Sequence, residues 1–306
     1  MLPTPLMRAA LVANVVAQIG IVITGGLVRL TGSGLGCPSW PQCVPGSYVP
    51  VLEQEEGFHK YIEFGNRTLT SVVGLTALGA LVVTFLLVRA GRERRLLALG
   101  AAPLALVVVQ AVLGGITVLT ALHPATVAAH FLVSTGLIAV SVVLLERLSQ
   151  SDHPAVPVVR HEVLLLGRLL VAVATVVLVL GTMVTGSGPH SGDADEPARL
   201  GLDPRTISWL HADAVLLFIG LTVGLLVALR VLDAPARVQR RATVLLGVTL
   251  AQGLIGYVQY LTDLPELLVL AHMLGACLLV VALTLTITAL HARVPAPRAQ
   301  EVLAPA

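Results

Sequence analysis

Three histidines lie inside long apolar segments of the sequence, where ionisable side chains are uncommon. His130, His211 and His272 each lie near one end of such a segment and share a similar depth. Ionisable groups are costly to bury among membrane helices, so they usually mark a functional site. Imidazoles from two helices of one bundle can ligate a haem iron from opposite faces, and His211 and His272 are expected to form such a pair. A hydrogen-bonded core position is the alternative for each ring.

Other roles fit the histidines of this sequence less well. A structural zinc site needs four nitrogen or sulfur ligands, and the sequence has no CxxC or HExxH spacing. His123 and His190 are expected in loops, where they could contact a haem propionate. His153, His161 and His291 are expected at the surface, near loops or the chain end.

A second group of polar residues lies in the segment FHKYIEFGNRTLT, residues 58–70. Glu63 and Arg67 are four residues apart, so they share one helix face and can form an ion pair. One interpretation is that they border a cavity, where Glu63 could move protons or bind an oxygenated substrate and Arg67 could hold an anionic group. The alternative is that both residues anchor the helix at the membrane interface.

The composition indicates which elements must position these side chains. Hydrophobic residues make up 56% of the chain and charged residues 12%, which excludes an ordinary soluble domain. The net charge of +2 gives no indication of nucleic-acid binding. The sequence predicts an all-α membrane protein with eight transmembrane helices, each needing about 20 residues. The apolar segments lie at about 8–30, 64–88, 97–119, 128–146, 166–186, 207–229, 242–261 and 268–290.

The distribution of arginines predicts the orientation of these helices. Arginines cluster in the connections after the second, fourth and sixth segments, and such residues are retained on the cytoplasmic side. Both termini are therefore expected in the cytoplasm, and the loop 31–60 is expected outside the cell membrane. The first apolar segment is expected to be a retained helix rather than a cleaved signal peptide.

Two cysteines lie in the outer loop, in the stretch TGSGLGCPSWPQC at 31–43. Cys37 and Cys43 are six residues apart and can close a small ring, and an extracytoplasmic compartment permits disulfides. A structural staple is the favoured interpretation, because a redox role would need an exposed thiol of low pKa. Cys277, within the last apolar segment, is expected to be a small core residue.

An internal repeat relates the two halves of the chain. TGSG at 31–34 returns at 185–188, and the stretches 109–131 and 251–273 align at an offset of 142. The repeat predicts two parallel four-helix bundles, 1–150 and 160–306, related by an axis along the membrane normal. The aligned polar and glycine pairs are Gln110 with Gln252, Gly114 with Gly256, and His130 with His272.

Five stretches together resemble the haem A synthase family, and the likeness covers essentially the whole chain. They are GGLVRLTGSGLGCPSWPQC, IEFGNR, HPATVAAH, VTGSGPHSGD and LVLAHM. The resemblance implies an eight-helix membrane oxidoreductase with a haem b cofactor in the C-terminal half. It also implies the reaction: the C8 methyl of haem O becomes the formyl of haem A, by two hydroxylations and loss of water, for haem–copper oxidases.

The resemblance implies a role for each matching residue. His211 and His272 would be the axial ligands of the haem b iron, and His130 would face the haem O substrate. Glu63 and Arg67 match the acidic residue and the arginine of the family's Glu-x-x-His-Arg motif. The cysteine pair matches the family's paired outer cysteines, and we expect it to shape the mouth of the substrate side.

One position departs from the family pattern. Asn66 aligns with His211 by helix depth and stands where the family motif has its second substrate-side histidine. An amide cannot ligate iron as imidazole does. Either His59, seven residues earlier, replaces it, or His130 is the single protein ligand and the other face of the iron is open. We favour the open face, because oxidation at this iron requires ligand exchange.

Partners and alternative functions follow from the same residues. Haem O is the expected substrate, with an unidentified electron donor and the haem O synthase as a candidate docking partner. A diheme b-type electron-transfer cytochrome would explain the three histidines but would give Glu63 and Arg67 no role. A transporter would explain the repeat and the charges within the membrane, but not a haem bound through His211 and His272.

Overall fold

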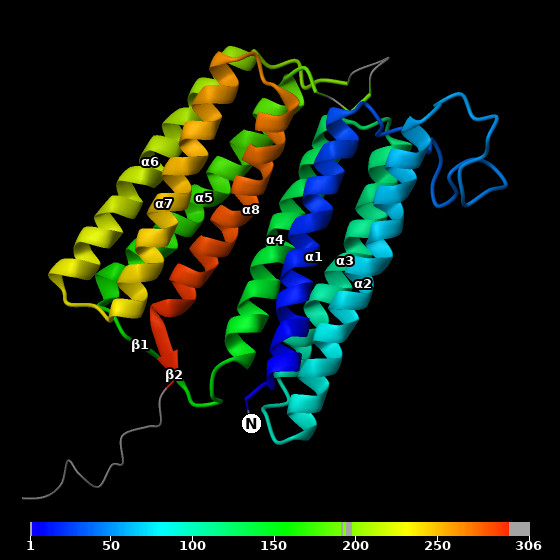
Figure 1. The fold of residues 1–306 in the computed structure, drawn as a ribbon. Helices are drawn as coiled ribbons and strands as arrows, with labels where there is room; N and C mark the ends of the chain where they lie inside the picture. The colour runs from blue at the N-terminus through cyan, green and yellow to red at the C-terminus, as the bar shows by residue number, and fades with distance from the viewer. Residues whose placement is uncertain (1, 191, 194–197, 294–306) are drawn as a thin grey trace, which may run out of the picture.

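The protein folds into long helices that run side by side (Figure 1). The computed structural model describes residues 2–190, 192–193 and 198–293, so residues 294–306 of the expected second half lie outside the described residues. Each of the eight helices in the described chain is long and apolar enough to span a membrane, which confirms the predicted all-α membrane fold. The elements are α1 (Pro5–Leu30), α2 (His59–Arg89), α3 (Leu96–Leu119), α4 (Pro124–Leu148), β1 (Ala155–Pro157), α5 (His161–Ser187), α6 (Pro204–Val231), α7 (Ala236–Leu261), α8 (Glu266–Ala289) and β2 (His291–Arg293).

Several helices begin earlier than the apolar segments predicted. The sequence predicted α6 to begin near residue 207, but it begins at Pro204. Pro204 occupies the first helical position, and the Asp203 side chain accepts a hydrogen bond of 2.8 Å from the backbone N–H of Thr206. Such caps satisfy backbone groups that lack a partner within the helix. A polar first turn carries no hydropathy signal, so the apolar pattern alone placed this boundary too late.

The helices form two rings of contacts. In the first ring, α1 packs against α2 and α4, and α3 packs against the same two helices. In the second ring, α5 and α7 each pack against α6 and α8. Helices α2 and α4 are therefore diagonal partners in the first ring, as α6 and α8 are in the second. The rings meet where α8 contacts α1 and α4 and where α4 contacts α5, as Figure 1 also shows.

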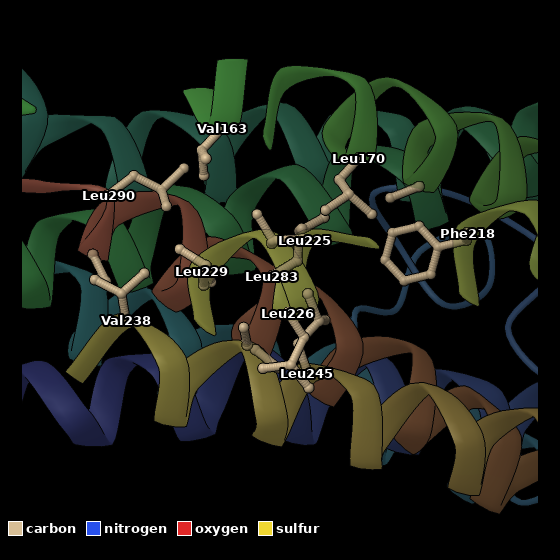
Figure 2. Packing of buried hydrophobic residues seen from close by; sticks show 14 of the residues in the cluster. Val163, Leu170, Phe218, Leu225, Leu226, Leu229, Val238, Leu245, Leu283 and Leu290 are labelled. Carbon is tan, nitrogen blue, oxygen red and sulfur yellow. The ribbon is translucent and has the colours of Figure 1, made fainter. Parts of the chain in front are cut away.

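A continuous apolar core holds the second ring together (Figure 2). Side chains from all four of its helices meet in this core, and each of them is buried. Among those labelled in Figure 2 are Leu170 of α5, Phe218 and Leu225 of α6, Leu245 of α7 and Leu283 of α8. The core fixes the diagonal spacing of α6 and α8, the two helices that carry His211 and His272.

The contact between the rings combines apolar packing with a buried hydrogen bond. Cys277 of α8 is fully buried in a cluster with Val22 of α1 and Ile138 of α4, which confirms its predicted place in the core. Elsewhere along the same two helices, Asn14 of α1 donates a hydrogen bond of 3.1 Å to Ser141 Oγ of α4. Both polar groups would be costly to bury without a partner, so the bond favours this pairing of α1 with α4.

An ion network joins the helix ends opposite the loop 31–58. Arg92 Nε donates to Asp152 Oδ2 at 2.9 Å, and Arg147 Nη2 donates to Asp152 Oδ1 at 2.7 Å. Burial of Asp152 opposes its ionisation, but the hydrogen bonds from Arg92 and Arg147 outweigh burial and hold the pKa of this carboxyl well below its usual range. The network fixes the chain after α4, which then forms β1 and pairs with β2.

Replacement of Asp152 by Asn should destabilise the protein at neutral pH by about 1–2 kcal/mol, because two charge-assisted hydrogen bonds are weakened at a partly exposed site. A carboxyl whose pKa is lowered by folding contributes stability above its unfolded pKa of about 4 and loses it as the pH falls further. The difference in melting temperature between wild type and Asp152→Asn should therefore shrink below about pH 4. Thermal unfolding in detergent measures it.

The control is Glu162→Gln, which removes an ion pair of two exposed side chains, Arg160 and Glu162. Its melting temperature should match the wild type at every pH. An Asp152→Asn protein that is as stable as wild type at neutral pH would show that the network has no structural role.

Candidate functional site

Three histidines and one asparagine each pack against a glycine of the preceding helix. The distance from a Cβ atom built on the glycine to the polar ring or amide measures how closely each side chain approaches. It is 3.4 Å for His130 on Gly114, 3.3 Å for His211 on Gly181, 3.2 Å for His272 on Gly256 and 3.9 Å for Asn66 on Gly25. A Cβ atom at Gly181 or Gly256 would require a small shift of the imidazole, and one at Gly114 would be in van der Waals contact with it. Side chains larger than alanine at these three glycines would therefore displace the imidazoles.

The four polar side chains lie at matched depth on the even-numbered helices. Each is six or seven residues from the beginning of its helix, which places it roughly 10 Å along the axis. They project from diagonal pairs of helices: Asn66 and His130 from α2 and α4, and His211 and His272 from α6 and α8. Each ring of helices thus has two polar side chains at one level.

The three imidazoles each have a buried ring nitrogen without a hydrogen-bond partner. Among the residues that the structure describes, Nδ1 of His130, His211 and His272 makes no hydrogen bond. An unpartnered polar atom in a buried position is costly. Imidazoles that rest on glycines and have a free ring nitrogen are suited to act as ligands of a metal-containing group.

Two glutamines support the histidine backbones in the same way in both rings of helices. Gln110 Nε2 donates to the backbone oxygen of His130 at 3.0 Å, and Gln252 Nε2 donates to that of His272 at 2.7 Å. Gln110 also contacts Ser134. The repeat in the sequence aligned these glutamines but did not indicate what they bind.

Asn66, and not His59, occupies the position in the first ring that matches His211. The Asn66 Oδ1 atom accepts a hydrogen bond of 2.7 Å from Thr24 Oγ1 of α1. His59 begins α2, where its Nδ1 lies 2.8 Å from Ser33 Oγ and its ring stacks on Phe58. The structure therefore brings Asn66 and His130 to one level and leaves His59 at the start of α2, beside the loop 31–58.

Glu63 and Arg67 form the predicted ion pair, at 2.5 Å, and together they bind the cysteine loop. Glu63 Oε2 accepts a hydrogen bond of 2.5 Å from the backbone N–H of Cys37. Arg67 donates to the backbone oxygens of Cys37, Ser39 and Gln42 at 2.6, 2.9 and 3.3 Å. Every nitrogen of the Arg67 guanidinium therefore has an acceptor. The ion pair clamps the loop to α2.

The loop itself is closed by the predicted disulfide. Cys37 and Cys43 are bonded and fully buried, which confirms the pairing. Trp40, between them, packs against Gly115 of α3, the residue after the glycine on which His130 rests. Trp40 therefore brings the loop to the level of His130, a contact that the sequence did not predict.

Two further side chains support the loop and were also missed from the sequence. Lys60 is buried, and its Nζ donates to the backbone oxygens of Val51 and Leu52 at 2.6 and 3.0 Å. Gln54 donates to the backbone oxygen of Gly36 at 2.5 Å. Buried charged and amide groups in a polar loop have no periodic signal, so the pattern could not distinguish them from solvated residues.

The other histidines lie away from these levels. His123 caps α4, accepting from the N–H of Ala125 at 3.3 Å, and His190 Nε2 lies 3.0 Å from the backbone oxygen of Leu264. The backbone oxygen of His190 accepts from Arg29 Nε at 2.6 Å, which joins α1 to the chain after α5. As predicted, the three histidines expected at the surface are exposed: His153, His161 and His291.

A family model for cytochrome oxidase assembly proteins, COX15-CtaA, matches residues 8–190 of this chain. The chain is 32% identical to a "Heme A synthase" of Geobacillus thermodenitrificans over 49% of its own length and 45% of the relative. It is 36% identical to a "Heme A synthase" of Lysinibacillus sphaericus over 44% of its length and 41% of the relative. A "Protoheme IX farnesyltransferase" of Halobacterium salinarum is 28% identical over 45% of this chain and 28% of that protein. These matches cover less than half of each relative.

Replacement of Arg67 by Lys should loosen the cysteine loop. A lysine ammonium cannot replace the five N–H donors of the guanidinium, so the buried disulfide should become accessible more often. We expect dithiothreitol to reduce the disulfide roughly tenfold faster than in wild type, which corresponds to loss of one or two net hydrogen bonds. Maleimide labelling of the released thiols measures the rate.

The matched control is Arg95→Lys, because the Arg95 side chain is 84% exposed and pairs only at the surface with Glu93. It should be reduced at the wild-type rate. Equal rates for Arg67→Lys and wild type would show that the clamp does not hold the loop closed.

Proposed function

Because this chain belongs to the COX15-CtaA family of cytochrome oxidase assembly proteins, we propose that it is a haem A synthase that oxidises the C8 methyl of haem O to the formyl of haem A. The observation that carries the proposal is the set of three imidazoles, each seated on a glycine at one depth in the membrane. The relatives named "Heme A synthase" support the same activity.

In this proposal the second ring of helices holds haem b through His211 and His272. The two imidazoles project from diagonal helices. Their unpartnered nitrogens and glycine seats fit a planar group held between them. The bound haem b would supply electron transfer. The chain's own contribution is to orient the imidazoles, which Gln252 supports through the backbone of His272.

The first ring holds the haem O substrate, with His130 as its protein ligand. His130 has the same glycine seat and the same glutamine support as His272. The difference between the rings is the cysteine loop, which reaches the level of His130 through Trp40. A loop clamped at the end of the first ring of helices suits a site that must open to admit substrate. A permanently bound cofactor requires no such opening.

Glu63 and Arg67 act in this proposal by holding that cover in place. The donors of Arg67 are engaged by Glu63 and by loop carbonyls, so we assign Arg67 to the loop rather than to an anionic group of the substrate. Glu63 receives both Arg67 and the N–H of Cys37, which couples its carboxylate directly to the disulfide. Movement of the loop would release the Glu63 carboxylate for proton transfer at the outer rim.

The proposal places both termini in the cytoplasm and the cysteine loop outside, because the arginine-rich connections lie at the end opposite the loop. Residues 1–150 then form the substrate half and residues 160–306 the haem b half. The relatives named "Protoheme IX farnesyltransferase" support a farnesylating enzyme as the source of haem O. The physiological electron donor would act on haem b.

The glycine seats can be tested through haem content. Gly256→Val should displace His272, because a Cβ atom there already lies within 3.2 Å of the ring, and overpacking of this size should weaken haem binding roughly tenfold. Gly253→Val is the matched control on the same helix, where an added Cβ meets open space. Haem per purified protein, from pyridine haemochrome spectra, should fall only for Gly256→Val; an equal loss in both variants would contradict the seat.

The activity itself is tested by pigment extraction. Membranes that contain this chain and a haem O source should yield haem A, and His272→Ala should abolish it by removing haem b. Glu63→Ala should lose at least about 90% of haem A while keeping the haem b spectrum, since loop control is lost but the ligands remain. Folded, haem-loaded protein that yields only haem O would exclude the proposal, and unchanged electron transfer in Glu63→Ala would then favour a diheme cytochrome.

A further inference from the structure

We propose that the first ring of helices contains a binding site for a small exchangeable ligand on the substrate iron, with the Asn66 amide as its hydrogen-bond donor and Thr24 as the residue that orients the amide. This inference rests on the proposed function, since it requires an iron porphyrin held by His130. It assigns to α1 and α2 a task that neither the resemblance nor the comparisons provide.

The glycine seat of Asn66 leaves more space than the seats of the three histidines. Asn66 takes the same place on α2 that His211 takes on α6, but its amide nitrogen lies 3.9 Å from the Cβ position of Gly25, whereas the imidazoles approach to between 3.2 and 3.4 Å. The shorter side chain leaves more space above the glycine and offers no imidazole nitrogen to iron. A haem held by His130 would therefore receive no imidazole from α2, which would leave room for a small molecule on that side.

Thr24 of α1 orients the Asn66 amide. Thr24 Oγ1 lies 2.7 Å from Asn66 Oδ1 and 3.2 Å from the backbone oxygen of Ile21. The shorter contact directs the amide oxygen toward α1. Among the described residues no acceptor is hydrogen-bonded to Asn66 Nδ2, so both of its N–H donors remain available. An amide held in this way can donate to a polar or anionic ligand, but not accept from one through its oxygen.

Among the four glycine seats, threonine precedes the glycine only at the seat that faces asparagine. The residue before the glycine seat is Thr24 in α1, opposite Asn66. At the three seats that hold histidines, the corresponding residues are aliphatic: Leu113, Leu180 and Ile255. A hydroxyl that orients an amide is therefore present at the one seat with an amide to orient, which indicates a specific pair rather than a chance loss of histidine.

The open face suits the chemistry that the first ring is proposed to perform. A porphyrin iron with imidazoles on both faces is saturated, as the haem b iron in the second ring would be. A single protein ligand leaves one coordination position for exchange, and a fixed donor beside that position stabilises a bound ligand that carries negative charge. The two rings of helices would thus share the glycine seats but perform different tasks. They differ at these seats in Asn66 against His211 and in Thr24 against Leu180.

The experiment uses the full-length protein in detergent, loaded with iron protoporphyrin, with carbon monoxide and azide as probes. Wild type should bind carbon monoxide at one of its two haems when reduced, and azide at the same haem when oxidised. Asn66→His should give a second bis-imidazole, low-spin haem and lose carbon monoxide binding at least about tenfold. Asn66→Leu should keep carbon monoxide binding but weaken azide roughly fivefold or more, the effect of one lost hydrogen bond. Thr24→Val should weaken azide in the same direction.

A transfer of the pair to the second ring provides the matched control. The double variant Leu180→Thr with His211→Asn should bind azide at the second haem, whereas His211→Asn alone should bind carbon monoxide there with weaker azide affinity. Thermal unfolding checks that each variant is folded. Asn66→His should fold because the three corresponding glycine seats of this chain hold histidines.

The outcomes separate this inference from the proposed function. Wild-type protein with two low-spin haems and no carbon monoxide binding would overturn the inference and leave the synthase proposal standing. Equal azide affinity in Asn66→Leu and wild type would overturn the role of the amide. Protein that takes up no haem, with no Soret band, would instead overturn the proposed function.

Discussion

The need to seat an imidazole between closely packed membrane helices governs much of this structure. A histidine at this depth requires space on the neighbouring helix and a partner for its polar atoms. Glycine on the preceding helix provides the space at Gly114, Gly181 and Gly256, and the glutamine side chains of α3 and α7 support two of the backbones. The position of a glycine on the preceding helix therefore sets the level at which each imidazole can pack.

The same arrangement carries different chemistry in the two rings of helices. The second ring is closed by an apolar core and presents two imidazoles on diagonal helices. The first ring presents one imidazole and one amide, and at its loop end lies a loop closed by a buried disulfide, which Glu63 and Arg67 clamp to α2. Under the proposed function, the ring of helices with the polar clamp would be the side that exchanges its contents, and the ring with the large apolar core would be the side that keeps its cofactor.

The sequence predicted the features that depend on local pattern. The apolar segments predicted eight spanning helices, the spacing of Glu63 and Arg67 predicted their ion pair, and the cysteine spacing predicted the disulfide. It did not predict the contact of Trp40 with Gly115 or the network around Asp152. These depend on segments that are distant in sequence, and the polar helix ends that place them carry no hydropathy signal.

By itself, the sequence determined that this chain spans a membrane and which side chains within it are ionisable, because burial of apolar length and the cost of buried charge are properties of composition and spacing. It also determined that Asn66 differs from the family motif. Helix depth in the sequence already placed Asn66, rather than His59, level with His130. Only the tertiary structure decided that Thr24 binds the Asn66 amide and that His59 lies beside Ser33. That decision requires the packing of α1 against α2, which brings a hydroxyl 42 residues away into hydrogen-bonding distance.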